Sequence, residues 1–458
     1  MPSITSPQEM TSSYPSVSHV QSLSPRVQRG LQRLVREIEG EVRVDSTSRM
    51  LYATDASIYD MDPLGVVLPK HEADLIRIVE ICGQSGIPLI PRAGGTSLSG
   101  QCVGDGLVLD ISKYMNQILE QNLEQRWIWA QPGVIQDHIN FTMAPHGLHF
   151  GPDTSTSNRA MIGGMIGNNS CGSHSIYYGT TVDHVLELEV ILSDGSKALF
   201  CDLTPEQLEQ KKQLSNLEGH IYREITRILE QYREQLEERY PKIVRKNNGY
   251  MLDQLLREDV PFNMSRLICA SEGTLALVNR AKLKIVPSPK YKGIVAVQFA
   301  MLREALVATV ESIKLDPAAV ELIDKKLLDL SKDNLSVQHL RFFLEGDPEA
   351  VLAIEFYDDT REAIEQRMDE LEQMLRDKQL GYTYPRLWGE DIEKVWQLRK
   401  AGLGVLYTLP GDAKPVTFVE DTAVAPEHLP AYIEEFQTIV QKYETTCVYY
   451  AHASVGEL

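Results

Sequence analysis

The sequence has few cysteines, and none of them is paired at the spacing of a metal or redox site. Its six cysteines include no C-x-x-C pair and stand at positions 82, 102, 171, 201, 269 and 447. This scatter argues against a disulfide framework or an iron–sulfur site and predicts reduced thiols in a cytoplasmic protein, with peripheral membrane association as an alternative. No run approaches the roughly 18 apolar residues of a membrane-spanning helix. Residues 1–24, rich in Ser and Pro, lack the apolar segment of a secretory signal and predict a disordered leader.

Positive charge is also scarce. Lys and Arg number 45 against 64 Asp and Glu, which gives a formal net charge of −19. Affinity for nucleic acids comes from clustered Lys and Arg, so this balance argues against a nucleic-acid partner. It stays compatible with one small anion bound in a locally prepared pocket.

The chain of 458 residues is too long for one ordinary core and predicts two or three domains. Short strands alternate with helices, which indicates an α/β or α+β fold. We predict a first domain over 25–289, with a charged helical excursion over 202–245, and a boundary at Pro287 and Pro289. For the second domain, over 290–446, the pattern predicts a small sheet with helices on one face.

The stretch PRAGGTSLSGQ, residues 91–101, has the composition of a phosphate-binding loop, but its glycines fit neither familiar nucleotide motif. A Rossmann fingerprint needs G-x-G-x-x-G and a P-loop needs G-x-x-x-x-G-K-[ST]. Here Gly94 and Gly95 are adjacent, and no lysine closes the stretch. Consecutive backbone N–H groups without side chains can bind an anion without positive side chains. A tight surface turn is the alternative.

Two more stretches of small residues favour a ligand. Residues 151–185 form a long segment with glycine at positions 163, 164, 167, 172 and 179, and SEGTLALV occupies 271–278. A loop of that length is uncommon unless it is functional or disordered, and apolar residues between the glycines argue for order. Three such loops in one half of the chain predict a long ligand extended over the domain.

Together these stretches resemble the vanillyl-alcohol oxidase and p-cresol methylhydroxylase (PCMH) family of flavoproteins. Within it the sequence is similar to the FAD-linked oxidase branch of D-lactate dehydrogenases, D-2-hydroxyglutarate dehydrogenases and the flavin subunit of glycolate oxidase. The resemblance runs from about Asp45 to the last residue. It implies an α+β fold, with a two-part FAD-binding domain of the PCMH type and then an α/β substrate (cap) domain with an antiparallel sheet. It also implies FAD, which many relatives attach to a histidine in the first loop; because that loop has none here, we predict non-covalent FAD.

The resemblance carries a set of cofactor-binding positions over to this chain. On the pyrophosphate side they are Arg92, Ala93, Gly94, Gly95, Thr96, Ser97 and Gln101. Near the flavin and ribityl chain they are Pro152, Asp153, Thr154, Ser157, Gly163, Gly164, Asn168, Ser170, Gly172 and Ser173. The adenine end is expected to be closed by Glu272, Gly273, Thr274 and Leu275, and the sheet to be completed by Ile285 and Val286.

The resemblance further implies oxidation of a D-2-hydroxy acid, of the lactate, glycolate or 2-hydroxyglutarate type, by hydride transfer to flavin N5. Arg399 stands where the family carries the arginine that binds the substrate carboxylate, and a surface salt bridge is the alternative role. In FVEDTAVAPEHL, Glu420 and Asp421 alternate, so only one can point into the site; we favour Asp421, with strand-edge charges as the alternative. Asn248 and Tyr250 are further candidates from a matching loop.

The final residues, AHASVGEL, match the start of the family's C-terminal active-site segment. His452 matches the first of two histidines that orient the substrate hydroxyl and, in several members, bind a divalent metal with a downstream glutamate. The second would follow Leu458, where the sequence stops, so we predict a truncated segment over 447–458 and no competent metal site.

Electrons are expected to pass to an iron–sulfur partner or a quinone. Two other hypotheses stay open. The missing second histidine favours an FAD-binding product or assembly subunit without catalytic activity. A nucleotide-sugar reductase on the same flavin fold is the other, although Arg399 and His452 would then have no role.

Overall fold

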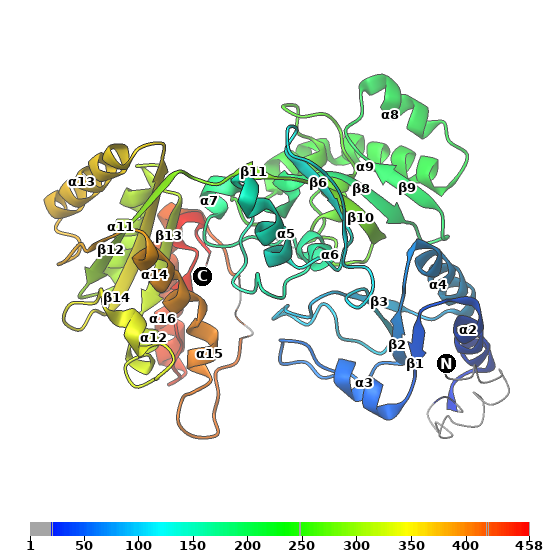
Figure 1. Cartoon of the computed structure of the whole chain (residues 1–458), viewed down its shortest axis with the longest axis horizontal. Helices are drawn as coiled ribbons and strands as arrows, with labels where there is room; N and C mark the ends of the chain where they lie inside the picture. Colours follow the sequence, from blue (N-terminus) through cyan, green and yellow to red (C-terminus); the bar gives the residue numbers. More distant parts are fainter. Residues whose placement is uncertain (1–19, 21, 247–248, 418, 420, 458) are drawn as a thin grey trace.

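The computed structural model describes residues 20, 22–246, 249–417, 419 and 421–457. Figure 1 shows two lobes, one formed by the first half of the chain and one by the second. The predicted leader over 1–24 lies almost wholly outside the described residues. The predicted mixture of helices and largely antiparallel sheets is confirmed.

The first sheet has the order β1-β2-β4-β3, formed by Glu41–Arg43, Gly65–Leu68, Leu107–Asp110 and Leu89–Arg92. β2, β4 and β3 are parallel, and β1 is antiparallel to β2. Its helices are α2 (Pro25–Glu37), α3 (Ser46–Tyr52) and α4 (Glu72–Ser85). α4 ends where the sequence predicts, because Gly86 adopts the left-handed conformation (φ 67°) that glycine takes without strain.

The second sheet is antiparallel, with the order β5-β6-β10-β8-β9, formed by Ile118–Asn122, Trp127–Ala130, Leu277–Lys284, Val185–Ile191 and Lys197–Phe200. Its helices are α5 (Gln136–Met143), α6 (Ile162–Asn168), α7 (Ser175–Tyr178), α8 (Pro205–Lys212), α9 (Leu217–Arg239) and α10 (Ser265–Ile268). α8 and α9 form the helical excursion that the sequence predicts, and Thr204 closes a capping box at the start of α8. A short pair, β7 (Leu148–His149) with β11 (Val286–Pro287), leads toward the second lobe.

The sheet of the second lobe has the order β15-β12-β14-β13-β16, formed by Arg386–Leu387, Tyr291–Phe299, Ala350–Asp358, Ala319–Asp324 and Tyr450–Ala451. One face packs against α11 (Leu302–Ile313), α13 (Arg361–Asp377) and α16 (Leu429–Lys442). The other packs against α12 (Lys325–Leu330), α14 (Glu390–Lys400) and α15 (Gly402–Leu406). The prediction of helices on one face is therefore wrong. β12 and β14 are almost wholly buried along their length, as strands covered on both faces are.

Short 3₁₀ helices complete the described chain, at Ala144–His146, Thr181–His184, Leu252–Leu255, Gln338–Arg341, Pro426–His428 and Ala453–Val455. In the part of the chain that the structure describes, no helix is both long and apolar enough to cross a membrane. The predicted domain boundaries at 289 and 446 stay predictions.

Candidate functional site

The three glycine-rich stretches, far apart in the sequence, meet around one cavity in the first lobe. Most of the predicted cofactor-binding residues line it: Arg92, Ala93, Gly94, Gly95, Thr96, Ser97, Gln101, Thr154, Gly163, Gly164, Asn168, Ser170, Glu272 and Gly273. The sequence interpretation missed several further lining residues, among them Cys102, Pro132, Thr156, Met161 and Ser271. All except Pro132 lie within or directly beside the glycine-rich stretches, but position in a stretch does not separate lining residues from core residues.

Close backbone contacts explain why glycine is needed here. A Cβ on Gly94 would lie 2.5 Å from the carbonyl oxygen of Arg159, and one on Gly164 would lie 3.3 Å from the Cβ of Ala93. The first and second stretches can therefore approach each other only because these side chains are absent. The third stretch is tied to the second by a hydrogen bond from Glu272 N to Gly167 O, at 2.9 Å.

The cavity fits a long, anionic cofactor such as FAD. Its wall combines glycine backbone and hydroxyl groups with apolar side chains. Gln101 Oε1 is buried there without a hydrogen-bond partner among the described residues. An unpaired buried polar atom is costly, so a bound ligand with a donor would stabilise it.

The predicted cofactor residues outside the cavity lining are Pro152, Asp153, Ser157, Gly172, Ser173, Thr274, Leu275 and Ile285. Several of them support the stretches that do line it. The carbonyl oxygen of Pro152 accepts a hydrogen bond from Gln136 Nε2 at 2.5 Å, and Thr274 Oγ1 donates to Ser271 O at 2.6 Å. Val286 pairs with His149 in the short sheet between the lobes.

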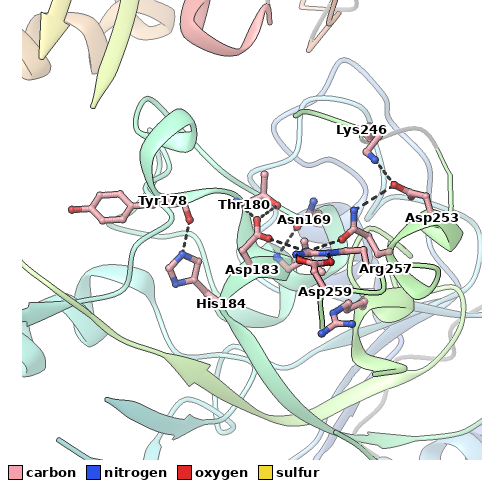
Figure 2. Close-up of polar contacts among 12 residues, drawn as sticks. Asn169, Tyr178, Thr180, Asp183, His184, Lys246, Asp253, Arg257 and Asp259 are labelled. Atoms are coloured by element: carbon pink, nitrogen blue, oxygen red, sulfur yellow. Dashed lines mark hydrogen bonds and ion pairs between the residues drawn. The ribbon is translucent and has the colours of Figure 1, made fainter. Parts of the chain in front are cut away.

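The end of the second stretch is held by its own polar contacts (Figure 2). Asn169 Oδ1 accepts a hydrogen bond from Val182 N at 2.8 Å, and Asp183 Oδ2 accepts one from Thr180 N at 2.9 Å. His184 Nε2 lies 2.8 Å from the carbonyl oxygen of Tyr178. The stretch is therefore ordered from within, as the sequence predicts.

In the second lobe, a buried carboxylate joins Arg399 and His452. Glu321 of β13 is 0% exposed, and its Oε2 accepts a hydrogen bond from Arg399 Nε at 3.0 Å. Its other oxygen lies 2.7 Å from His452 Nδ1. Burial alone would lower the pKa of His452, but the charge of Glu321 and its hydrogen bond raise that pKa above its usual value. The alternative of a surface salt bridge for Arg399 is wrong, because its side chain is 7% exposed.

A second buried carboxylate lies on the same face of the sheet. Glu321 pairs with Ala353 and Ala319 pairs with Glu355, so the two glutamates are diagonal neighbours. Glu355 Oε2 lies 2.5 Å from His174 Nε2, and His174 Nδ1 lies 2.9 Å from Asp153 Oδ2. The sequence interpretation missed His174, Glu321 and Glu355, because the contacts of Glu321 with His452 and of Glu355 with His174 join segments more than a hundred residues apart.

A third group surrounds Arg245, whose side chain is almost wholly buried. It contacts Cys171 Sγ, lies 2.5 Å from Glu457 Oε1 and donates to Asp421 Oδ2 at 3.2 Å. Burial raises the pKa of Glu457 to about 7. Asp421 is 48% exposed and has a positive φ of 51°.

Three further predicted active-site candidates are Glu420, Asn248 and Tyr250. Glu420 and Asn248 lie outside the described residues. The hydroxyl of Tyr250 lies 2.9 Å from Thr274 Oγ1, at the third glycine-rich stretch. Within the described residues, no group of three or more His, Cys, Asp or Glu side chains could hold a metal ion.

Two family models match the chain. Residues 63–197 match the FAD binding domain, and residues 288–458 match the C-terminal domain of the FAD linked oxidases. The first match includes the first two glycine-rich stretches of the cavity, and the second includes the buried carboxylates of the second lobe; the third glycine-rich stretch lies between the two matches.

Two curated proteins and one solved structure are similar to the chain. The D-2-hydroxyglutarate dehydrogenase of Pseudomonas putida is 34% identical over 92% of this chain and 43% of its own length. The glycolate oxidase subunit GlcD of Bacillus subtilis is 27% identical over 92% of this chain and 78% of its own. An alkyldihydroxyacetonephosphate synthase has the same fold, with a TM-score of 0.62 at 15% identity, over 92% of this chain and 76% of its own. The chain thus spans less than half the length of the Pseudomonas relative.

Proposed function

The chain belongs to the family of FAD-linked oxidases and its cofactor is FAD; on that premise, we propose that it oxidises a D-2-hydroxy acid. The observation that carries the proposal is the buried contact of Arg399 and His452 with one carboxylate, Glu321. A substrate of this class needs a cation for its carboxylate and a base for its hydroxyl, and these two side chains supply both.

FAD, when bound, supplies the acceptor for the hydride that leaves the substrate carbon. Arg399 binds the substrate carboxylate through its planar guanidinium. Glu321 holds that guanidinium in one orientation from a β-strand, which is a more rigid support than a loop. Trp396, one turn before Arg399 on α14, is buried, as is Tyr357.

His452 takes the proton of the substrate hydroxyl. Its Nδ1 faces a carboxylate oxygen and therefore carries a hydrogen, which leaves Nε2 as the atom that accepts the proton. The raised pKa makes the imidazole a stronger base once it is neutral. Because the pKa of His452 is raised in the folded protein, we expect the rate to rise with pH until His452 is deprotonated, at a higher pH than for a free imidazole.

D-2-hydroxyglutarate is the first acid to test, since the relative with 34% identity is named for it. We infer that FAD is bound non-covalently, because none of the histidines lies in the first stretch. We also infer that electrons leave to a separate acceptor, an iron–sulfur subunit or a quinone, because one relative is itself a subunit. The six free cysteines favour a cytoplasmic location.

The test is anaerobic mixing of the FAD-loaded protein with D-2-hydroxyglutarate, D-lactate, L-lactate and glycolate, followed through the visible absorbance of oxidised flavin. Loss of that absorbance with a D-acid and not with L-lactate supports the proposal. A spectrum that no acid changes, in protein that dithionite still reduces, overturns it and leaves an FAD-binding chain without this activity.

A further inference from the structure

His174 joins the two lobes of the molecule through a buried chain of charges. It comes from the second glycine-rich stretch of the first lobe, between Ser170 of the cavity wall and α7. Its ring contacts Asp153 of the same lobe at 2.9 Å and Glu355 of the second lobe at 2.5 Å. Its backbone N–H also donates to Asp153 Oδ1 at 3.1 Å, so both oxygens of that carboxylate are engaged by one residue.

The two ring contacts fix the charge of His174. Each ring nitrogen faces a carboxylate oxygen, so each must donate, and only the imidazolium has two N–H donors. Burial alone would lower the pKa of His174, but the charge of Asp153 and the hydrogen bonds to Asp153 and Glu355 raise it to about 10. The carboxylate of Glu355 is 1% exposed, so its charge is compensated by this contact rather than by water.

The imidazolium also packs against the helix that carries the substrate arginine. Its ring is stacked on Tyr357, with centroids 5.5 Å apart and an interplanar angle of 14°, and lies 5.2 Å from the ring of Trp396. Trp396 belongs to α14 and precedes Arg399 by one turn. His174 therefore touches both supports of the proposed substrate site: the sheet face of Glu355 and Glu321, and α14.

The backbone around His174 is built for this position. A Cβ on Gly172 would lie 1.4 Å from the carbonyl oxygen of Asp153, so no other residue fits without moving the chain. Glycine here lets the segment lie directly on Asp153 and present the imidazole to the second lobe.

We propose that His174 is a positioning residue for the reaction proposed above: it holds Glu355, and α14 with Arg399, in a fixed place relative to the cofactor-binding stretch. The proposal rests on the proposed function for its effect on the reaction, but not for its effect on the structure. Both effects can be measured on the same protein.

The kinetic test uses H174Q, which keeps one donor and loses the charge. We expect the KM for the D-acid to rise about tenfold or more, because Arg399, which binds the substrate carboxylate, is displaced. We expect kcat to fall less than about threefold, because the hydride acceptor is not displaced. The matched control is H149Q. His149 stacks edge-on against Tyr178 in the same aromatic group, and burial lowers its pKa to about 4, so it carries no charge to lose. H149Q should change KM less than twofold, and an unchanged KM in H174Q overturns the proposal.

The structural test needs no turnover. Hydrogen exchange of the α14 amides in the FAD-loaded protein should be at least about fivefold faster in H174Q than in wild type or H149Q. If wild type oxidises no acid but this difference is present, the proposed function fails and the positioning role stands. If α14 exchanges alike in all three proteins, the positioning role fails. Should H174Q not fold, E355Q replaces it, because glutamine keeps the shape of the Glu355 side chain and removes its charge. The α14 amides of E355Q must then exchange faster than in wild type, by a smaller factor than expected for H174Q.

Discussion

Glu321 contacts Arg399 with one carboxylate oxygen and His452 with the other, from the middle of a buried strand. A buried charge is tolerated only when it is paired, so each of the three side chains depends on the other two. Of these three residues, Glu321 is the one that the sequence interpretation did not find, although it named both partners. A single glutamate in the apolar run AVELID gives no signal of what it will contact.

Replacing Arg399 with lysine tests this arrangement at one residue. Lysine keeps the charge but lacks the planar fork of N–H donors that can hold Glu321 and a substrate carboxylate in fixed directions, so we expect R399K to raise KM roughly tenfold or more. Steady-state kinetics with the D-acid measures it. R227K is the control, because Arg227 is an exposed arginine on α9 whose ion pair with Glu224 contributes little. A KM within twofold of wild type in R399K would show that Arg399 does not bind the carboxylate.

At the scale of elements, the glycine-rich stretches act through close approach. Gly172 and Gly94 lie against backbone carbonyl oxygens, which cannot move without shifting a whole segment. Other glycines have room around them. A Cβ on Gly404 in α15 would lie more than 4 Å from every described residue outside its own helix turn, so glycine is not required at that position by close packing.

The pair G172A and G404A separates these two cases. In G172A the added methyl group meets Asp153 O, and we expect a loss of stability of at least about 1–3 kcal/mol, with a lower melting temperature. In G404A the methyl group enters open space on a helix, where alanine is more favourable than glycine by roughly 0.5–1 kcal/mol. Thermal unfolding of both variants checks the sign. Equal melting temperatures would mean that the contact at Gly172 is relaxed in solution.

Much at the scale of elements could be predicted from the sequence. The helix ending at Gly86, the capped helix after Thr204 and the cavity-forming glycine stretches follow from local patterns of capping, periodicity and small residues. The helices on the second face of the sheet in the second lobe could not be predicted in this way, and neither could the contact of His174 with Glu355. Both depend on which distant segments meet in the fold, 181 residues apart in the case of His174 and Glu355, and local residue spacing carries no information on such pairings.

At the scale of the whole molecule, FAD binding should stabilise the fold, because the cavity is closed by three segments that are distant in the sequence. A ligand that binds only the folded state at a hundred times its Kd adds about 2.7 kcal/mol. We expect the melting temperature to rise with added FAD in wild type and in R399K. In G94A, where a Cβ would meet Arg159 O, the rise should be much smaller. An equal rise in G94A would place the cofactor elsewhere.

The charges between the lobes make stability depend on pH. His174 faces Asp153, Glu355, Tyr357 and Tyr178, and its pKa is raised to about 10 in the folded protein, compared with 6.5 for the free side chain. The folded state therefore holds a proton that the unfolded state has released between pH 6.5 and about 10. Stability from this residue is fully present below pH 6.5 and is lost as the pH rises through that window.

His452, whose pKa is also raised, contributes in the same direction, so the comparison must isolate His174. We expect the free energy of unfolding of the FAD-loaded wild type to fall more steeply between about pH 7 and 9 than that of H174Q. The difference in slope approaches one proton, about 1.4 kcal/mol per pH unit at most. Urea unfolding at several pH values, with H149Q as the matched control, measures it. Parallel slopes in wild type and H174Q would mean that His174 is neutral, and that one of its two carboxylate contacts is absent in solution.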